Sequence, residues 1–271
     1  MRGLAARSTR GFRLFRESVL SAVMLGSLIV ATIPVQAAEI RVYSGGAPQA
    51  ALKLFATEFE QTTGHKLAFT FGVVGAIRQR LASGEKADVI LLPAPMIDAM
   101  DKAAALRPES RHVLARVGIG VVVREGAVLP DISGPEAVRK TLLDARSIAY
   151  PDPKVTPSGT HLSRMLAKLG IAEAVESKTT LRNAIDGGVT LVANGDVEIG
   201  MFLVSETLPV KGVRLVGLLP SGLQSYVVYA GAVAIDSASS EPALAFVRFL
   251  ASTAKHEHWK AAGFEPLSGV K

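Results

Sequence analysis

The sequence predicts an α/β protein of two β/α lobes joined by two hinge crossings. After residue 38 the chain alternates strand-like and helix-like segments, which is typical of parallel strands covered by helices. A second set of such segments follows from about residue 135. Two β-rich passages, near residues 115–124 and 222–232, connect the two sets. Because the chain passes twice between the sets, we expect the C-terminal helices to return to the first lobe.

The first set of elements begins at residue 40. Strands are expected where β-rich or alternating runs end at glycine, and helices where apolar residues recur every three or four positions. The expected strands lie at 40–44, 66–71 and 88–92, and the expected helices at 50–61, 76–82 and 93–105. Since each strand precedes a helix, parallel pairing is expected.

The second set lies between the two β-rich passages. Its expected elements are helices at 135–143, 162–169 and about 180–193, and strands at 148–150, 198–203 and 213–218. A strand at 226–235 and helices at 242–250 and 254–262 complete the chain. The predicted domain division is a signal peptide at 1–38, lobe one at 39–118 plus 226–271, and lobe two at 119–225.

The first 38 residues have the three parts of a cleavable signal peptide. Five arginines precede Ser18, an apolar run continues to Ile33, and small residues follow at Val35-Gln36-Ala37-Ala38. The apolar run is shorter than the ~20 residues of a membrane span, and Pro34 ends it. The alternative is a single N-terminal anchor helix. We therefore expect the rest of the chain to work in the periplasm.

Composition narrows the function further. The formal net charge of +6 is partly due to the five arginines of the N-terminal segment, and no basic run with interleaved aromatic residues remains to bind nucleic acid. The chain has no cysteine, which excludes disulfides, thiolate nucleophiles and a lipid-bearing N-terminal cysteine. We expect a freely diffusing monomer.

Three loops share one design, in which a strand ends at small residues and a helix follows. They lie at 44–47, 72–76 and 157–160. Helix N-termini present unpaired N–H groups and a partial positive charge, so such loops bind anions without Lys or Arg. The alternative is that the serines and threonine only cap helices and the glycines only form turns.

Motifs for catalysis are missing from the sequence. It contains no P-loop, G-x-G-x-x-G, H-E-x-x-H or G-x-S-x-G pattern, and its five histidines have no metal-ligand spacing. We therefore predict no enzyme, no catalytic residue, no metal and no cofactor. Asp88 is expected to anchor local backbone, and Arg182 either clamps a carboxylate or lies on a solvated face. A secreted hydrolase using Ser158 or Ser44 is the enzyme alternative.

The chain resembles the type II periplasmic substrate-binding proteins, and most of all the molybdate-binding family of ABC transporters. The resemblance covers nearly all of the chain after the signal. The segments that carry it are 40–44, 71–80, 83–89, 152–159, 168–170, 198–200, 249–250 and 262–264.

The resemblance implies a cleft that holds an anion through hydroxyl and backbone donors, closes by a hinge and delivers its ligand to a membrane permease. Ser44 matches the first serine of that family. Val73 and Val74 stand where the family presents hydroxyls, and Leu203 stands where it has a tyrosine. A buried divalent oxyanion with fewer donors is costly, so we expect a small organic carboxylate. A molybdate- or tungstate-type oxyanion, and a sensing module for a signalling receptor, are the alternatives.

The predicted ligand-binding residues come from the three loops and from the second crossing. They are Ser44, Gly45, Gly46, Val74 and Gly75 in lobe one, Ser158, Gly159 and Thr160 in lobe two, and Gln224 and Tyr226 near the hinge.

Overall fold

The computed structural model describes residues 37–183 and 187–267. The predicted signal peptide lies outside these residues except for Ala37 and Ala38. The described residues belong to one compact unit. None of the helices in the two described stretches combines the length and the apolar character that a membrane crossing requires.

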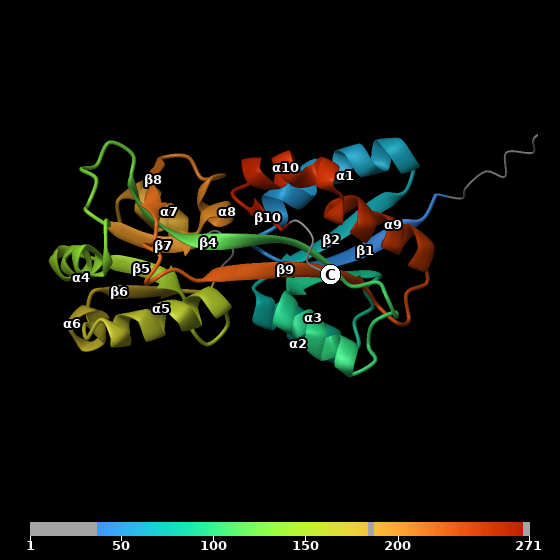
Figure 1. Cartoon of the computed structure of the whole chain (residues 1–271), viewed down its shortest axis with the longest axis horizontal. Helices are drawn as coiled ribbons and strands as arrows, with labels where there is room; N and C mark the ends of the chain where they lie inside the picture. The colour runs from blue at the N-terminus through green and yellow to red at the C-terminus, as the bar shows by residue number, and fades with distance from the viewer. Residues whose placement is uncertain (1–36, 184–186, 268–271) are drawn as a thin grey trace, which may run out of the picture. The chain divides into compact units, whose positions relative to one another are not determined.

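The strands form two groups that share β4, His112–Arg124 (Figure 1). In the first group, β1 is parallel to β2 and β3, whereas β9 runs antiparallel between β3 and β4. The elements of this group are β1 Glu39–Gly45, α1 Gln49–Thr63, β2 Lys66–Gly72, α2 Val74–Ala82, β3 Val89–Pro93, α3 Ala94–Lys102, β9 Tyr226–Val233, α9 Ser240–Ala251, η1 Thr253–Lys255, α10 His256–Ala261 and β10 Glu265–Pro266.

The second group is built on the far half of β4. That strand pairs with β9 as far as Gly118, and from Ile119 onwards with β7 and, through Gly120–Arg124, with β8. Strands β7, β5 and β6 follow in parallel. The elements are α4 Pro135–Asp144, β5 Ile148–Pro151, α5 Pro157–Lys168, α6 Ala172–Glu176, β6 Thr179–Arg182, α7 Gly187–Asn194, β7 Ile199–Leu203, α8 Val204–Thr207 and β8 Val213–Leu218. The change of partner after Gly118 lies at the predicted lobe boundary, while the division into lobes stays a prediction.

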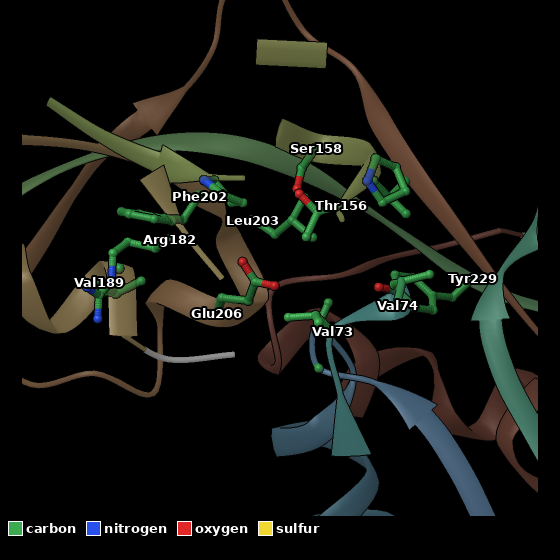
Figure 2. Close-up of a pocket in the computed structure, with 16 residues that line it drawn as sticks. Val73, Val74, Thr156, Ser158, Arg182, Val189, Phe202, Leu203, Glu206 and Tyr229 are labelled. Atoms are coloured by element: carbon green, nitrogen blue, oxygen red, sulfur yellow. The ribbon is translucent and has the colours of Figure 1, made fainter. Parts of the chain in front are cut away.

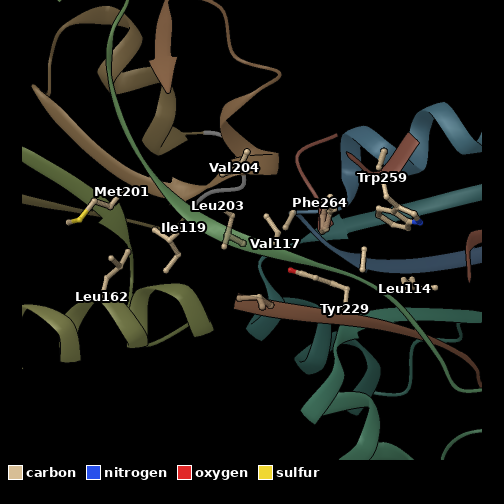
Figure 3. Close-up of a cluster of buried hydrophobic side chains, with 14 of the residues drawn as sticks. Leu114, Val117, Ile119, Leu162, Met201, Leu203, Val204, Tyr229, Trp259 and Phe264 are labelled. Atoms are coloured by element: carbon tan, nitrogen blue, oxygen red, sulfur yellow. The ribbon is translucent and has the colours of Figure 1, made fainter. Parts of the chain in front are cut away.

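Helices cover both faces of each group. Figure 1 shows α1, α9 and α10 on one side of the first group and α2 and α3 on the other. The largest cluster of buried side chains continues along β4 from one group into the other. Figure 3 shows this continuity from Trp259 and Phe264, past Val117 and Ile119, to Met201. The shared strand and the shared core hold the two groups together.

The structure corrects the expected bounds of three helices and adds elements that were not expected. The expected helix at 180–193 is wrong in its first part, because Thr179–Arg182 is a strand paired with β5; its described helical part is α7, Gly187–Asn194. Helices α2 and α5 begin earlier than expected, at Val74 and Pro157, because each follows directly from an extended residue. The parallel pairing expected for the strands at 40–44, 66–71 and 88–92 is confirmed, and β9 adds an antiparallel strand to that group. The short helices α6 and α8 were not expected.

Candidate ligand-binding cleft

A cavity lies where the two strand groups face each other. It encloses about 580 Å³ of space not filled by atoms, part of which is open to solvent. Figure 2 shows the side chains around it. The first group contributes residues from the β1–α1 loop, the start of α2 and β9, and the second group those from β5, α5, β6, α7, β7 and α8. The lining residues are Gly46, Ala47, Val73, Val74, Pro151, Thr156, Pro157, Ser158, Arg182, Gly188, Val189, Phe202, Leu203, Glu206, Val227 and Tyr229.

Two helices begin at the cavity. Among the described residues no backbone acceptor pairs with the N–H group of Val74 at the start of α2, or with that of Ser158 at the start of α5, and both residues line the cavity. Unpaired N–H groups are normal in a first helical turn, and they attract anions. These two helix starts therefore offer donors from opposite sides of the cavity.

The start of α5 also provides a free hydroxyl. Thr156 is the N-cap: its Oγ1 accepts from the Gly159 N–H at 3.1 Å and donates to the Asp152 carbonyl at 3.0 Å. Gly159 is required there, because a Cβ would lie 2.2 Å from the Pro151 oxygen. Ser158 Oγ, by contrast, makes no hydrogen bond to another described residue, although the serine is buried. It is the hydroxyl that remains for a ligand.

Arg182 brings the positive charge. It is the last residue of β6, where its backbone pairs with Pro151 at the carboxyl end of β5. Its Nε is buried and has no hydrogen-bond partner, and no described carboxylate forms an ion pair with the guanidinium. An unpaired buried donor on a guanidinium is costly unless a ligand satisfies it. Planar guanidinium groups match the geometry of carboxylates and phosphates.

Glu206 brings a carboxyl group to the same cavity. It lies on α8, directly after β7, and Figure 2 shows its carboxyl group pointing into the cavity. Burial raises the pKa of Glu206 from 4.5 to about 7, and a backbone hydrogen bond at Leu203 only partly offsets this. No described cation forms an ion pair with it. In the two described stretches, acidic and histidine side chains form no group of three that could hold a metal ion.

Tyr229 lies on β9 at the side of the first strand group. Burial, together with the nearby charge of Glu206, raises the pKa of its phenol, so the hydroxyl stays protonated. A Cβ added to Gly45 would come within 3.3 Å of this hydroxyl. Gly45 thus leaves room for the tyrosine at the edge of the cavity.

The rest of the wall is apolar. Phe202 is the largest apolar side chain among the lining residues, and it fits because its neighbours are glycines: a Cβ on Gly188 or Gly200 would lie within 2.4 Å of its ring. Val73 and Val74 face it from the first strand group (Figure 2). The cavity thus combines one cation, one carboxyl group and a hydrophobic surface.

The cavity brings together only part of the residue set predicted from the sequence. Gly46, Val74 and Ser158 line it. Ser44 is fully buried and its hydroxyl donates to the Gly45 carbonyl at 2.9 Å, so it lies outside the lining. Gly159 serves the cap of α5.

Gly75 and Thr160 line a neighbouring cavity instead, together with Arg78 and Lys154. The hydroxyl of Thr160 donates to the Pro153 carbonyl at 2.7 Å.

The two predicted hinge residues have partners on β4. Gln224 forms two hydrogen bonds with the backbone of Ile119, at 3.0 and 2.9 Å. The ring of Tyr226 lies 4.1 Å below the guanidinium carbon of Arg116. Both residues therefore act on the strand that the two groups share, away from the cavity lining.

A serine hydrolase finds no support at Ser158. The nearest histidine in sequence, His161, has its Nε2 2.8 Å from the Leu223 carbonyl. Among the described residues, no hydrogen bond links a histidine to Ser158.

Comparison with known proteins identifies the family. The family model for bacterial extracellular solute-binding proteins matches residues 40–265. The chain belongs to this family. A match of that length spans both strand groups, so the family assignment covers the cavity as well as the fold.

Relatives within and around the family have different activities. An aconitate isomerase from a Pseudomonas species is 33% identical over 258 residues, covering 92% of this chain and 97% of that protein. The molybdate-binding protein ModA of Azotobacter vinelandii is 31% identical over 192 residues, covering 68% of this chain and 71% of that protein. Among solved structures, the periplasmic molybdate-binding protein of Azotobacter vinelandii superposes with a TM-score of 0.73 at 19% identity, covering 84% of this chain and all of that one. The chain is a type II substrate-binding protein resembling ModA.

Proposed function

We propose that the cleft binds a small organic carboxylate and that the protein delivers it, from the periplasm, to the permease of an ABC importer. The observation that carries the proposal is Arg182, a cation with an unpaired buried Nε in the wall of the cavity. Carboxylate oxygens of the ligand would accept from this guanidinium, from Ser158 Oγ and from the Val74 N–H at the start of α2. The bound ligand favours closure because it touches both strand groups.

The remainder of the wall supports an organic ligand. Val74, Phe202 and Val227 offer hydrophobic contacts that a carbon skeleton can use and an inorganic oxyanion cannot. This apolar part of the wall favours an organic carboxylate over molybdate or sulfate.

The role in import rests on the family rather than on the cavity. Solute-binding proteins of this kind work outside the cytoplasm, and the Arg-rich and apolar sequence at residues 1–33 supports export by a cleavable signal. A sensing role with the same cleft is the alternative. Co-purification with a permease would favour the import role, whereas co-purification with a sensor kinase would favour the sensing role.

A titration of the purified protein tests the proposal. The probes are tricarballylate (a saturated tricarboxylate), propionate, sulfate and molybdate. A carboxylate at about a hundred times its Kd should stabilise the fold by about 2.7 kcal/mol and raise the Tm by several degrees. Arg182→Gln should weaken binding by about a hundredfold, since charged hydrogen bonds contribute about 1.5–3 kcal/mol.

Arg164→Gln is the matched control, because Arg164 is exposed on α5 and forms no ion pair with another described residue. It should bind as the wild type does. Equal binding by Arg182→Gln and Arg164→Gln would contradict the assignment of Arg182.

A second candidate is an isomerase acting on an unsaturated polycarboxylate. The observation that favours it is Glu206, whose pKa of about 7 suits proton transfer at neutral pH, in a chain 33% identical to an aconitate isomerase. The Glu206 carboxylate would take a proton from the carbon beside the double bond. The double bond then shifts, the chain rotates, and the same proton returns to the other end of the allylic system.

Proton NMR of trans-aconitate incubated with the protein tests this candidate. Conversion to the cis isomer that is lost in Glu206→Gln and kept in Glu125→Gln, an exposed acidic residue, would support it. If the wild type converts no trans-aconitate at protein concentrations that bind the probe fully, the isomerase candidate is contradicted and only the binding function remains.

A further inference from the structure

An acidic side chain in the wall of an anion-binding cavity needs an explanation. Glu206 points into the cavity, and Figure 2 shows Arg182 on one side of it and Val73 on the other. No cation of the described residues forms an ion pair with it. If a ligand carboxylate enters, two carboxyl groups of like charge meet in a largely apolar space. Such pairs keep one proton between them, because both cannot ionise there.

Among the residues that line the cavity, Glu206 is the group that can take up a proton when the ligand binds. Helix α8 packs against β4, β7 and β8. Of these, only β7 lines the cavity, through the apolar Phe202 and Leu203. The remaining charged or titratable lining residues are Arg182 on β6, which keeps its charge, and Tyr229 on β9, which is already protonated.

We propose that the cleft binds a polycarboxylate together with one proton. Arg182 pairs with one carboxylate of the ligand, and protonated Glu206 donates a hydrogen bond to a second. The inference rests on the proposed function and makes it more specific: the ligand has at least two carboxyl groups, and Glu206 selects for the second. A monocarboxylate satisfies Arg182 but leaves Glu206 without its partner.

The raised pKa of Glu206 in the free protein supports this assignment. Near neutral pH the side chain is close to its midpoint, so a modest additional repulsion from the ligand suffices to protonate it. Above the pKa, the affinity should fall about tenfold per pH unit, which is the limit for uptake of one proton.

Isothermal titration with tricarballylate tests the inference. At about pH 8 the free probe is fully ionised, and titrations in triethanolamine and in Tris, two amine buffers whose ionisation enthalpies differ, count the protons taken up. Wild type and Glu125→Gln should take up close to one proton, and Glu206→Asp should keep this uptake. Glu206→Gln should bind without uptake and with an affinity independent of pH. Propionate should bind more weakly than tricarballylate to the wild type.

Three results would overturn the inference. Tricarballylate binding to the wild type without proton uptake would overturn it while leaving the carboxylate cleft intact, and this count requires no variant to fold. Equal uptake by Glu206→Gln would also overturn it, by moving the proton to another group. Binding of molybdate or sulfate without binding of tricarballylate would overturn both the inference and the proposed function.

Discussion

Asp88 and Glu206 are both shielded carboxyl groups, one in each strand group, with opposite surroundings. Asp88, just before β3, accepts from the Arg41 backbone and guanidinium and from Ser237 Oγ, at 2.8 to 3.2 Å. Burial raises the pKa of Asp88, but these hydrogen bonds outweigh burial and leave it at about 2. Glu206 is buried and forms no ion pair with a described cation, and its pKa rises to about 7.

The difference separates a structural carboxylate from a functional one. Asp88 ties the amino end of β3 to β1 and to the turn after β9, so its charge stabilises the fold. Glu206 makes no comparable contribution, and its unsatisfied charge lowers the stability of the empty protein. A group in a cavity wall that destabilises the empty protein is typical of a residue that binds a ligand.

The largest expected effect is on Glu206. The raised pKa means that the folded protein holds a proton that the unfolded chain releases, so stability falls as pH rises from about 4.5 to about 7. Glu206→Gln should remove this dependence and stabilise the free protein at about pH 8 by up to about 3 kcal/mol. Urea unfolding at several pH values measures it. A destabilised variant at alkaline pH would break the comparison.

Asp88→Asn should act in the opposite direction. The depressed pKa of Asp88 contributes about 2 kcal/mol of stability above about pH 4, which is lost as pH falls towards about 2. The variant should lose about this amount at neutral pH and show a weaker acid transition. Its affinity for tricarballylate should not change, since Asp88 is not among the residues that line the cavity.

Ser237→Ala examines one bond of the same cluster. The hydroxyl of Ser237 donates to Asp88 at 2.8 Å, and a hydrogen bond to a charged group contributes about 1.5 kcal/mol. We expect a loss of about 1 kcal/mol, since the Arg41 bonds to Asp88 remain. Chemical denaturation at neutral pH measures the change. If Ser237→Ala loses as much stability as Asp88→Asn, the Ser237 bond and the Arg41 bonds to Asp88 do not act independently.

The smallest effect on stability is expected for Ser158→Ala. Its Oγ makes no hydrogen bond to another described residue, so the free energy of unfolding should change by less than about 0.5 kcal/mol. The affinity for tricarballylate should still fall by about fivefold, since a hydrogen bond contributes about 1 kcal/mol. If the variant loses stability but keeps its affinity for tricarballylate, Ser158 stabilises the start of α5 and does not bind the ligand.

The sequence predicted the strand and helix order well because glycines and apolar periodicity mark those elements directly. It assigned residues 180–182 to a helix, since the pairing with β5 that makes them part of a strand is not local. Glu206 escaped notice because α8 has four residues, too few for a periodic pattern. Ser44 could be named from its loop, but the direction of its hydroxyl depends on the folded backbone.

The central claim is that the cavity takes an organic carboxylate rather than an inorganic oxyanion. Isothermal titration of the wild-type protein with tricarballylate, followed by molybdate, tests it in one experiment. We predict saturable tricarballylate binding at one site, with no displacement by molybdate. Molybdate that binds tightly and excludes tricarballylate would contradict the claim.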